Sequence, residues 1–429
     1  MELIKLTEQE FKEFSSNHEQ ATFLQTINWG KLKEHNGWKY ELLGFKKDNE
    51  IIAGMMLLSK QTPIKKKMFY APRGFILDYK NEELLRNFTE EVKKYVKKNN
   101  GIFIKIDPYV EGIERDIDGK VVENGYNNKN IINELKKLGF KEQFAKPGQV
   151  SLQPKWLYRI DTKDKTLEEV MKDMTSKTRQ MIRKNEKNGV VVREGNYEDL
   201  EEFQKIMEHT SERRNFLDRS LSYYQNMYTS FGNGEILRLY FADLMIEEQL
   251  DKLKKELVEL EKAYQVLINN NENGKRVKEQ TLNEKKLEID KVKDNITKYE
   301  ELYKKHGSKL TLGGVLFFIY GKEVLAFLGG AYKDYMEFQC SYSIYYELIK
   351  YAVENKYDYY NFYGISSDLS PKDPMYGVYL FKKGFGGKVV ELLGEYDLPV
   401  SKFYYTIYKI SYDVVHKLKK LKTKIHHKK

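Results

Sequence analysis

A heptad pattern between Ile246 and Tyr303 constrains the fold of this chain more than any other feature. Apolar residues recur at alternating steps of four and three in two runs, the spacing of a coiled-coil helix. A polar turn signal, Asn269 to Gly274, separates the runs. The pattern predicts an antiparallel helical hairpin at residues 246–307, projecting on the order of 35 Å from its base. The runs are Ile246, Leu250, Leu253, Leu257, Leu260, Tyr264 and Leu267, then Leu282, Ile289, Val292, Ile296, Tyr299 and Tyr303.

The segments that flank this arm have the composition of β-strands. Residues 235–244 lead into it and residues 310–320 lead out, and both are rich in aliphatic and aromatic side chains. The arm therefore interrupts a sheet, and we expect it to fold on its own and to contact a partner or a second copy of the chain.

A pattern of hairpin, helix and strand occurs twice, which predicts two similar α/β domains. The first copy spans residues 39–58, 82–98 and 101–107, and the second spans residues 312–331, 341–355 and 357–363. The predicted organisation is a first domain at 1–150, a second at 151–245 and 308–396, the arm at 246–307, and a C-terminal helix with a basic tail at 397–429.

Composition and targeting signals predict a cytoplasmic protein. The N-terminus lacks the plan of a signal peptide, and no window approaches 18 consecutive apolar residues. The single cysteine, Cys340, rules out an internal disulfide and fits a reducing compartment. We expect Cys340 to be a buried structural thiol, and His209 to be structural too.

The net charge of +10 favours a polyanionic partner, although solvation of the surface is the alternative. A basic helix should begin at Thr175 or Ser176 and end at Gly189, and its cations are candidates for binding RNA phosphates, with a solvated surface as the alternative. The still more basic residues 417–429 fit either an anionic membrane surface or a solubilising tail. The candidate RNA-binding residues are Lys177, Arg179, Arg183 and Lys184.

Several catalytic motifs are missing. The chain has no G-x-x-x-x-G-K-[ST], no G-x-S-x-G, no H-E-x-x-H and no Cys-x-x-Cys. Nucleotide hydrolysis, serine hydrolysis and zinc chemistry therefore lack support, and we expect neither a metal nor a cofactor.

Six short motifs follow one another along the chain. They are Phe23 to Trp29 with Lys33, Tyr70 to Gly74, Ile106 to Tyr109, Thr210 to Arg213 with Arg219 and Tyr223, Tyr360 to Ile365, and Phe381 to Phe385. Taken in this order, they resemble those of the FemABX family of peptidoglycan interpeptide-bridge aminoacyltransferases, closest to FemA-like members with a helical arm. The resemblance covers nearly the whole chain. It implies two tandem acetyltransferase-like (GNAT) domains, with aminoacyl-tRNA as co-substrate.

The reaction implied by this resemblance transfers glycine, alanine or serine to the stem-peptide amine of a precursor that is either lipid-linked or nucleotide-linked. An aminoacyl ester is already activated, so the protein has mainly to align the amine and to stabilise the oxyanion. Asp107 is a candidate proton acceptor, with a cap at the strand end as the alternative. Lys382 and Lys383 are candidates for the oxyanion or a substrate carboxylate, with an exposed glycine-rich turn as the alternative.

The resemblance also implies residues for the precursor. Lys33, Arg219 and Tyr223 are expected to hold its diphosphate, for which a guanidinium beside an ammonium is suited. Arg73 and Tyr363 are further candidates for binding substrate. The enzyme could contact the inner membrane face peripherally.

Two other functions remain open at this point. The fold permits an acyl-CoA-dependent N-acyltransferase, although no R-x-x-G-x-G/A loop enters a helix. A non-catalytic RNA-binding protein would also explain the basic surface and the coiled coil.

Overall fold

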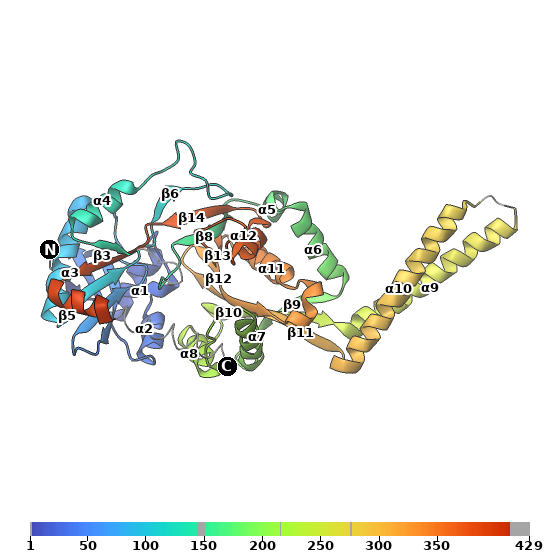
Figure 1. The fold of residues 1–429 in the computed structure, drawn as a ribbon, viewed down its shortest axis with the longest axis horizontal. Helices are drawn as coiled ribbons and strands as arrows, with labels where there is room; N and C mark the ends of the chain where they lie inside the picture. Colours follow the sequence, from blue (N-terminus) through green and yellow to red (C-terminus); the bar gives the residue numbers. More distant parts are fainter. Residues whose placement is uncertain (1, 144–150, 215, 275–276, 412–429) are drawn as a thin grey trace.

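The computed structural model describes residues 2–143, 151–214, 216–274 and 277–411. Two mixed sheets with helices packed around them form the body, and a pair of long helices projects from it (Figure 1). The predicted mixed α/β class is confirmed. No helix in the described ranges is long and apolar enough to cross a membrane.

The first sheet has seven strands in the order β1-β2-β3-β4-β5-β15-β7, and the second has eight in the order β6-β14-β8-β13-β12-β11-β10-β9. The strands are β1 (Ile4–Lys5), β2 (Lys39–Lys47), β3 (Glu50–Gln61), β4 (Lys67–Ala71), β5 (Gly101–Ile106), β6 (Glu111–Glu114), β7 (Lys141–Gln143), β8 (Trp156–Asp161), β9 (Val190–Gly195), β10 (Leu237–Met245), β11 (Lys309–Tyr320), β12 (Glu323–Ala331), β13 (Tyr359–Gly364), β14 (Lys388–Leu392) and β15 (Glu395–Pro399).

The helices follow the same chain order. They are α1 (Glu8–Asn17), the 3₁₀ turn η1 (Phe23–Gln25), α2 (Ile27–Glu34), α3 (Glu82–Lys98), α4 (Lys129–Lys137), α5 (Leu167–Asp173), α6 (Ser176–Lys187), α7 (Leu200–Arg214), α8 (Leu221–Ser230), α9 (Ile246–Glu272), α10 (Glu279–His306), the 3₁₀ segment η2 (Lys333–Phe338), α11 (Ser341–Glu354) and α12 (Tyr376–Lys383).

Both sheets contain the same unit of three antiparallel strands, a helix, and a fourth strand parallel to the third. The unit is β2-β3-β4-α3-β5 in one sheet and β10-β11-β12-α11-β13 in the other. The predicted repeat is therefore present but shifted by one strand, because β4 is not predicted from the sequence. In this alignment the arm takes the place of the tight β2–β3 turn, where Asp48 and Asn49 have positive φ.

The sheets exchange strands, so the predicted boundaries at residues 150 and 396 do not separate them. β6 precedes residue 150 yet lies at the edge of the second sheet, and β15 crosses residue 396 yet lies between β5 and β7 of the first. A local pattern predicts that a short strand forms but not which sheet it joins. The C-terminal helix begins at residue 402, after β15, and the basic tail 417–429 lies outside the described residues.

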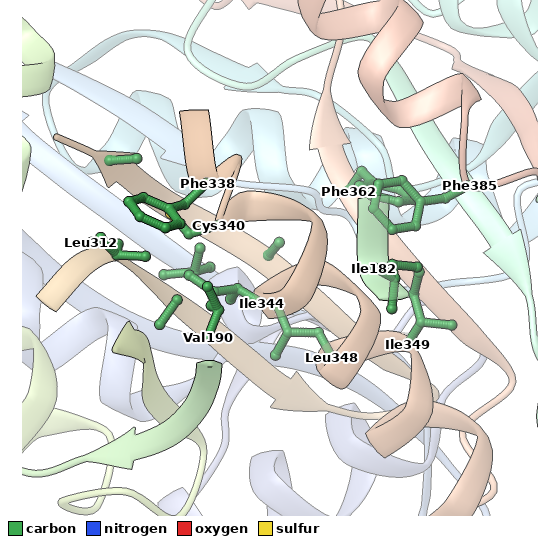
Figure 2. Packing of buried hydrophobic residues seen from close by; sticks show 14 of the residues in the cluster. Ile182, Val190, Leu312, Phe338, Cys340, Ile344, Leu348, Ile349, Phe362 and Phe385 are labelled. Carbon is green, nitrogen blue, oxygen red and sulfur yellow. The ribbon is translucent and has the colours of Figure 1, made fainter. Parts of the chain in front are cut away.

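Local signals set the helix ends. The Asn81 side chain caps α3, which has the predicted bounds, and Thr175 caps α6 through the backbone N–H of Thr178. The apolar face of α11 then packs on the second sheet. Figure 2 shows part of this core, with Ile344 of α11 near Val190 and with Phe362 beside Phe385. Cys340 is buried at the start of α11, and burial raises the pKa of its thiol to about 12, as expected of a structural cysteine.

The arm is an antiparallel helix pair. Ion pairs join its helices at matching heights, Lys254 with Glu300 at 3.2 Å and Lys293 with Glu261 at 2.8 Å. The predicted seam residues are buried or half-buried except Tyr303, which is 41% exposed. α9 continues to Glu272, so the turn comes later than the predicted Asn269.

The base of the arm belongs to the core of the second sheet, which corrects the expectation of an independent hairpin. Leu250, Leu253, Val292 and Tyr299 are buried in that core. The hydroxyl of Tyr299 also donates a hydrogen bond of 2.7 Å to the carbonyl oxygen of Asn188. Only the part of the arm beyond these contacts is free of the body.

Candidate functional site

The two units meet across a shared apolar cluster of η1, α2, α7, α8 and strands from both sheets. The ring of Phe23 lies 3.7 Å from that of Phe318, nearly parallel to it. Six of the twelve predicted site residues lie near this cluster. They are Lys33, Arg73, Asp107, Arg219, Tyr223 and Tyr363.

Asp107 follows β5 and is 2% exposed. Its Oδ1 accepts the backbone N–H of Arg73 at 2.6 Å, and its Oδ2 accepts the hydroxyl of Tyr70 at 3.0 Å. Burial raises the pKa of Asp107 to about 6, against the lowering effect of the Arg73 charge and of these hydrogen bonds. The carboxyl group therefore has the affinity for a proton that a base acting near neutral pH requires. The contact with Arg73 also makes it the cap that the alternative interpretation expected.

Arg73 joins the two units. It follows β4 with a φ of 54°, and its Nη2 donates a hydrogen bond of 2.9 Å to the carbonyl oxygen of Pro154. Its guanidinium lies 5.4 Å from the centroid of the Tyr109 ring. Arg73 is 2% exposed, so its charge acts inside the interface and not on the surface.

A buried acidic residue from the second sheet lies next to this group. Glu323, the first residue of β12, accepts the hydroxyl of Tyr109 at 2.8 Å and the side-chain amide of Asn361 at 2.9 Å. Asn361 also donates to the Tyr109 hydroxyl at 3.1 Å. Burial raises the pKa of Glu323, and the two donors oppose that change.

Glu323 and Asn361 were not predicted. Glu323 follows the turn at Gly321, where an acidic residue is ordinarily solvated. In the fold it is buried, because Tyr109 of the other unit packs against it and donates a hydrogen bond to it. Asn361 lies within the motif Tyr360 to Ile365, which by itself indicates no role for it. A polar residue in the middle of an otherwise aromatic strand was the signal that could have drawn attention to it.

Tyr363 lies next to this polar network. Its φ is 65°, its backbone N–H donates to Asn361 Oδ1 at 2.8 Å, and its hydroxyl donates to Gln153. Burial raises the pKa of Tyr363 to about 12, and the charges of Arg73, Asp107 and Glu323 also act on it, as does Tyr223.

Lys33, in the last turn of α2, and Arg219, just before α8, form a cation cluster. The Lys33 ammonium lies 4.2 Å from the centroid of the Trp29 ring, and the Arg219 guanidinium 4.5 Å from that of Tyr223. Burial, followed by the charges of Arg219 and Lys60, lowers the pKa of Lys33 to about 8. Within the part of the chain that the structure describes, neither Lys33 nor Arg219 forms an ion pair. The cluster therefore carries positive charge that the protein does not neutralise.

Lys382 and Lys383 diverge, although they are adjacent in α12. Lys382 is buried, and its ammonium donates to the carbonyl oxygens of Phe362 at 2.8 Å and Gly364 at 2.6 Å, which end β13. Burial lowers the pKa of Lys382 to about 7. Lys383 instead pairs with Asp118 in the loop after β6, away from the strand ends.

The outer face of α6 is basic. Lys177, Arg183 and Lys184 are exposed, and none of them forms an ion pair among the described residues. Arg179 differs. Its Nη1 donates to the carbonyl oxygens of Met171 at 3.1 Å and Lys172 at 3.3 Å, so its side chain caps the C-terminal end of α5. A surface hollow of about 510 Å³ is lined by Ser176, Arg179, Gln180, Arg183, Lys184 and Lys187.

Known proteins match this chain over nearly its full length. The model described as the FemAB family matches residues 6–413. The aminoacyltransferase FemA of Staphylococcus epidermidis is 33% identical over 428 residues, 98% of this chain and 100% of that protein. The aminoacyltransferase FemA of Staphylococcus aureus strain bovine RF122 / ET3-1 is 32% identical over 417 residues, 95% and 97% of the two chains. A crystal structure of FemX has a TM-score of 0.80 and 28% identity, covering 95% of this chain and 99% of its own.

Proposed function

Because this chain belongs to the FemAB family, we propose that it is an aminoacyltransferase that moves an amino acid from aminoacyl-tRNA to the stem-peptide amine of a peptidoglycan precursor. The relatives of known name are aminoacyltransferases, which supports the reaction class. In this proposal the two repeated units are acetyltransferase-like domains, and the enzyme acts in the cytoplasm on glycine, alanine or serine, without a metal or nucleotide cofactor.

One observation carries the proposal beyond the family name. Lys33 and Arg219, which form no ion pair among the described residues, and the buried carboxyl group of Asp107 both lie beside the apolar cluster that the two units share. Aromatic side chains connect them, since the Phe327 ring is 5.4 Å from Phe23 and 5.6 Å from Tyr363. A substrate with an anionic end and a reacting amine fits this arrangement.

The cation pair would hold the diphosphate of the precursor. A dianion would relieve the repulsion between Lys33 and Arg219, and the guanidinium can bind two phosphate oxygens at once. Tyr223 keeps Arg219 in place through its ring. Arg73 and Tyr363, further along the interface, would then contact the part of the precursor between the diphosphate and the reacting amine.

Asp107 would accept the proton that the attacking amine releases. With a pKa of about 6, the Asp107 carboxyl group is ionised in most molecules at pH 7 and can accept a proton. The proton taken from the amine then passes to solvent or to the ribose oxygen that leaves. Transfer needs no covalent enzyme intermediate: the amine nitrogen bonds to the ester carbonyl carbon, and the C–O bond to the tRNA ribose breaks. Lys382 would hold the end of β13 in place through its two hydrogen bonds, and its third N–H would stabilise the oxyanion.

The exposed face of α6 would contact the tRNA backbone through Lys177, Arg183 and Lys184. Unpaired cations spaced along one helix suit phosphates, which dominate affinity for nucleic acids. The Nη1 of Arg179 is already engaged with α5, so we expect Arg179 to contribute less than the other three.

The test is transfer of a labelled amino acid to purified precursor from a mixed pool of aminoacyl-tRNAs. Lys33→Ala and Arg219→Ala should each raise the KM for precursor roughly ten- to a hundred-fold, with a smaller change in kcat, because the diphosphate is bound alike in the ground and transition states. Lys31→Ala, an exposed lysine on the same helix, is the control. Activity that survives RNase but requires acyl-CoA would overturn the proposal.

A further inference from the structure

Glu323 is a buried carboxylate whose two oxygens differ. The residue is 5% exposed, and its hydrogen bonds from the Tyr109 hydroxyl and the Asn361 amide both end on Oε2. Oε1 accepts no hydrogen bond from the residues that the structure describes. Solvent still reaches Oε1, because this atom does not belong to the side-chain atoms that are both fully buried and without a partner. A carboxylate oxygen in such a place is favourable only if a donor, a cation or water reaches it.

The charges around Glu323 leave a net negative charge at the interface of the two units. The guanidinium of Arg73 acts on the carboxyl groups of both Asp107 and Glu323, and none of these three residues forms an ion pair within the described ranges. The second cation that acts on Glu323 is Arg159, which is already paired with Glu111 at 2.7 Å. One guanidinium therefore serves two carboxyl groups, and one further cation would balance them.

Glu323 lies close to the residues that the proposed reaction uses. Tyr109, which donates to Glu323, is two residues from Asp107, so their Cα atoms are separated by about 7 Å at most. Asn361, the other donor, lies on β13, the strand whose end holds the ammonium of Lys382. The open oxygen of Glu323 is therefore attached to the same short segments as the proposed base and the proposed oxyanion group.

We propose that Glu323 binds the α-ammonium group of the amino acid that is transferred. The inference rests on the proposed function and adds the group of the donor that this carboxylate recognises. In an aminoacyl ester the α-ammonium is on the carbon next to the reacting carbonyl, so its site must lie beside the reacting atoms. Oε1 supplies the negative charge, and the pairing keeps the α-amino group protonated. Glycine, alanine and serine all carry this group and differ only in the side chain.

The α-ammonium fits Oε1 better than other cations do. The attacking amine has to reach the ester as a free base, so a carboxylate that held it as an ammonium would oppose the reaction, and Asp107 is available to take its proton. A divalent metal ion needs several ligands, and in the described part of the chain no three His, Cys, Asp or Glu side chains gather around one point. The α-ammonium of the donor needs one carboxylate and stays charged throughout the transfer.

The experiment compares two donors that differ in this group alone. One is the aminoacyl-tRNA that the enzyme uses, and the other is the tRNA ester of the matching α-hydroxy acid, glycolyl for glycyl or lactyl for alanyl. The wild type should favour the aminoacyl ester in kcat/KM by about ten- to a hundred-fold beyond the ratio of their uncatalysed aminolysis rates, the range for a hydrogen bond to a charged group. Glu323→Gln, which keeps an acceptor for Tyr109 and Asn361, should lower kcat/KM for the aminoacyl ester by the same factor and leave that for the hydroxyacyl ester unchanged.

Glu111→Gln is the matched control, since Glu111 is a nearby acid that Arg159 already pairs. This variant should affect both donors by the same factor and keep the wild-type ratio between them. Circular dichroism melting checks that both variants fold. The donor ratio of the wild type tests the proposal without any variant.

Equal use of the two donors by the wild type, after the correction for uncatalysed rates, would overturn the inference. So would a folded Glu323→Gln variant that loses activity equally with both donors, as a purely structural residue would, or one that keeps the wild-type preference. All of these results require transfer from tRNA to occur. They therefore differ from failure of the proposed function, in which no aminoacyl-tRNA serves as donor and the inference falls with it.

Discussion

Lys33 offers a prediction in which stability and binding change in opposite directions. The lowering of its pKa from 10.5 to about 8 corresponds to a cost of about 3 kcal/mol for the charged form in the fold. Partial exposure of the side chain reduces this cost, so Lys33→Met should raise the free energy of unfolding by about 1–2 kcal/mol at pH 7. Methionine keeps the apolar contact with Trp29 and removes the charge.

The effect should depend on pH in a defined direction. The folded state binds this proton more weakly than the unfolded state, so the cost is fully present below pH 8. It disappears as the pH rises from about 8 to 10.5, where the unfolded lysine also loses its proton. The stability gained by Lys33→Met should shrink over that window.

Binding should move the other way. Inorganic pyrophosphate, used as the probe, should bind the Lys33→Met variant about ten-fold more weakly than the wild type. Near pH 8 the wild type should also take up protons on binding, because the anion restores the pKa of Lys33, and calorimetry in buffers of different ionisation enthalpy measures this uptake.

Urea denaturation at several pH values, with calorimetry, makes the comparison. Lys31→Met is the control, since Lys31 is exposed and paired with Glu8 at 3.2 Å, and its stability should change by less than about 0.5 kcal/mol. A Lys33→Met variant that is less stable than the wild type, or that binds pyrophosphate equally well, would show that Lys33 is not an unpaired cation that binds an anionic ligand.

Three further predictions concern the reaction and the arm. Asp107→Asn should lower kcat/KM and remove the rise in activity around pH 6 that the ionisation of Asp107 produces, as measured in a pH–rate profile; an unchanged ascending limb would assign it to another group. Lys382→Met should reduce kcat more than it changes the KM for precursor, and equal losses in both would point to binding instead. Replacing residues 266–288 by a glycine-serine loop should leave the melting temperature within about 2 °C, because none of the residues described in that range is buried. Replacing 246–307 should instead destabilise the protein by several kcal/mol through the loss of Leu250, Leu253, Val292 and Tyr299 from the core. Equal melting temperatures for the two arm variants would contradict the assignment of the base to the core.

Elements with strong local signals were predictable from the sequence alone. The period of apolar residues predicted the arm helices, and an amphipathic pattern predicted α3 at its observed bounds. Strand-like runs around turn residues predicted hairpins at residues 39–58 and 312–331, and the structure has them at 39–61 and 309–331. The ordered motifs also predicted the family that the comparisons show. Each of these signals lies within a short stretch of chain.

The tertiary structure decided which distant residues meet. β15 joins the first sheet and β6 the second because short strands take whichever edge the folded units present. Glu323 is a buried acid beside Tyr109 of the other unit, which is 214 residues away in sequence. Adjacent lysines diverge for the same reason, since Lys382 faces the end of β13 while Lys383 faces Asp118. Burial and pairing are properties of the assembled surfaces, so the charge state of each site residue depends on neighbours that no local pattern names.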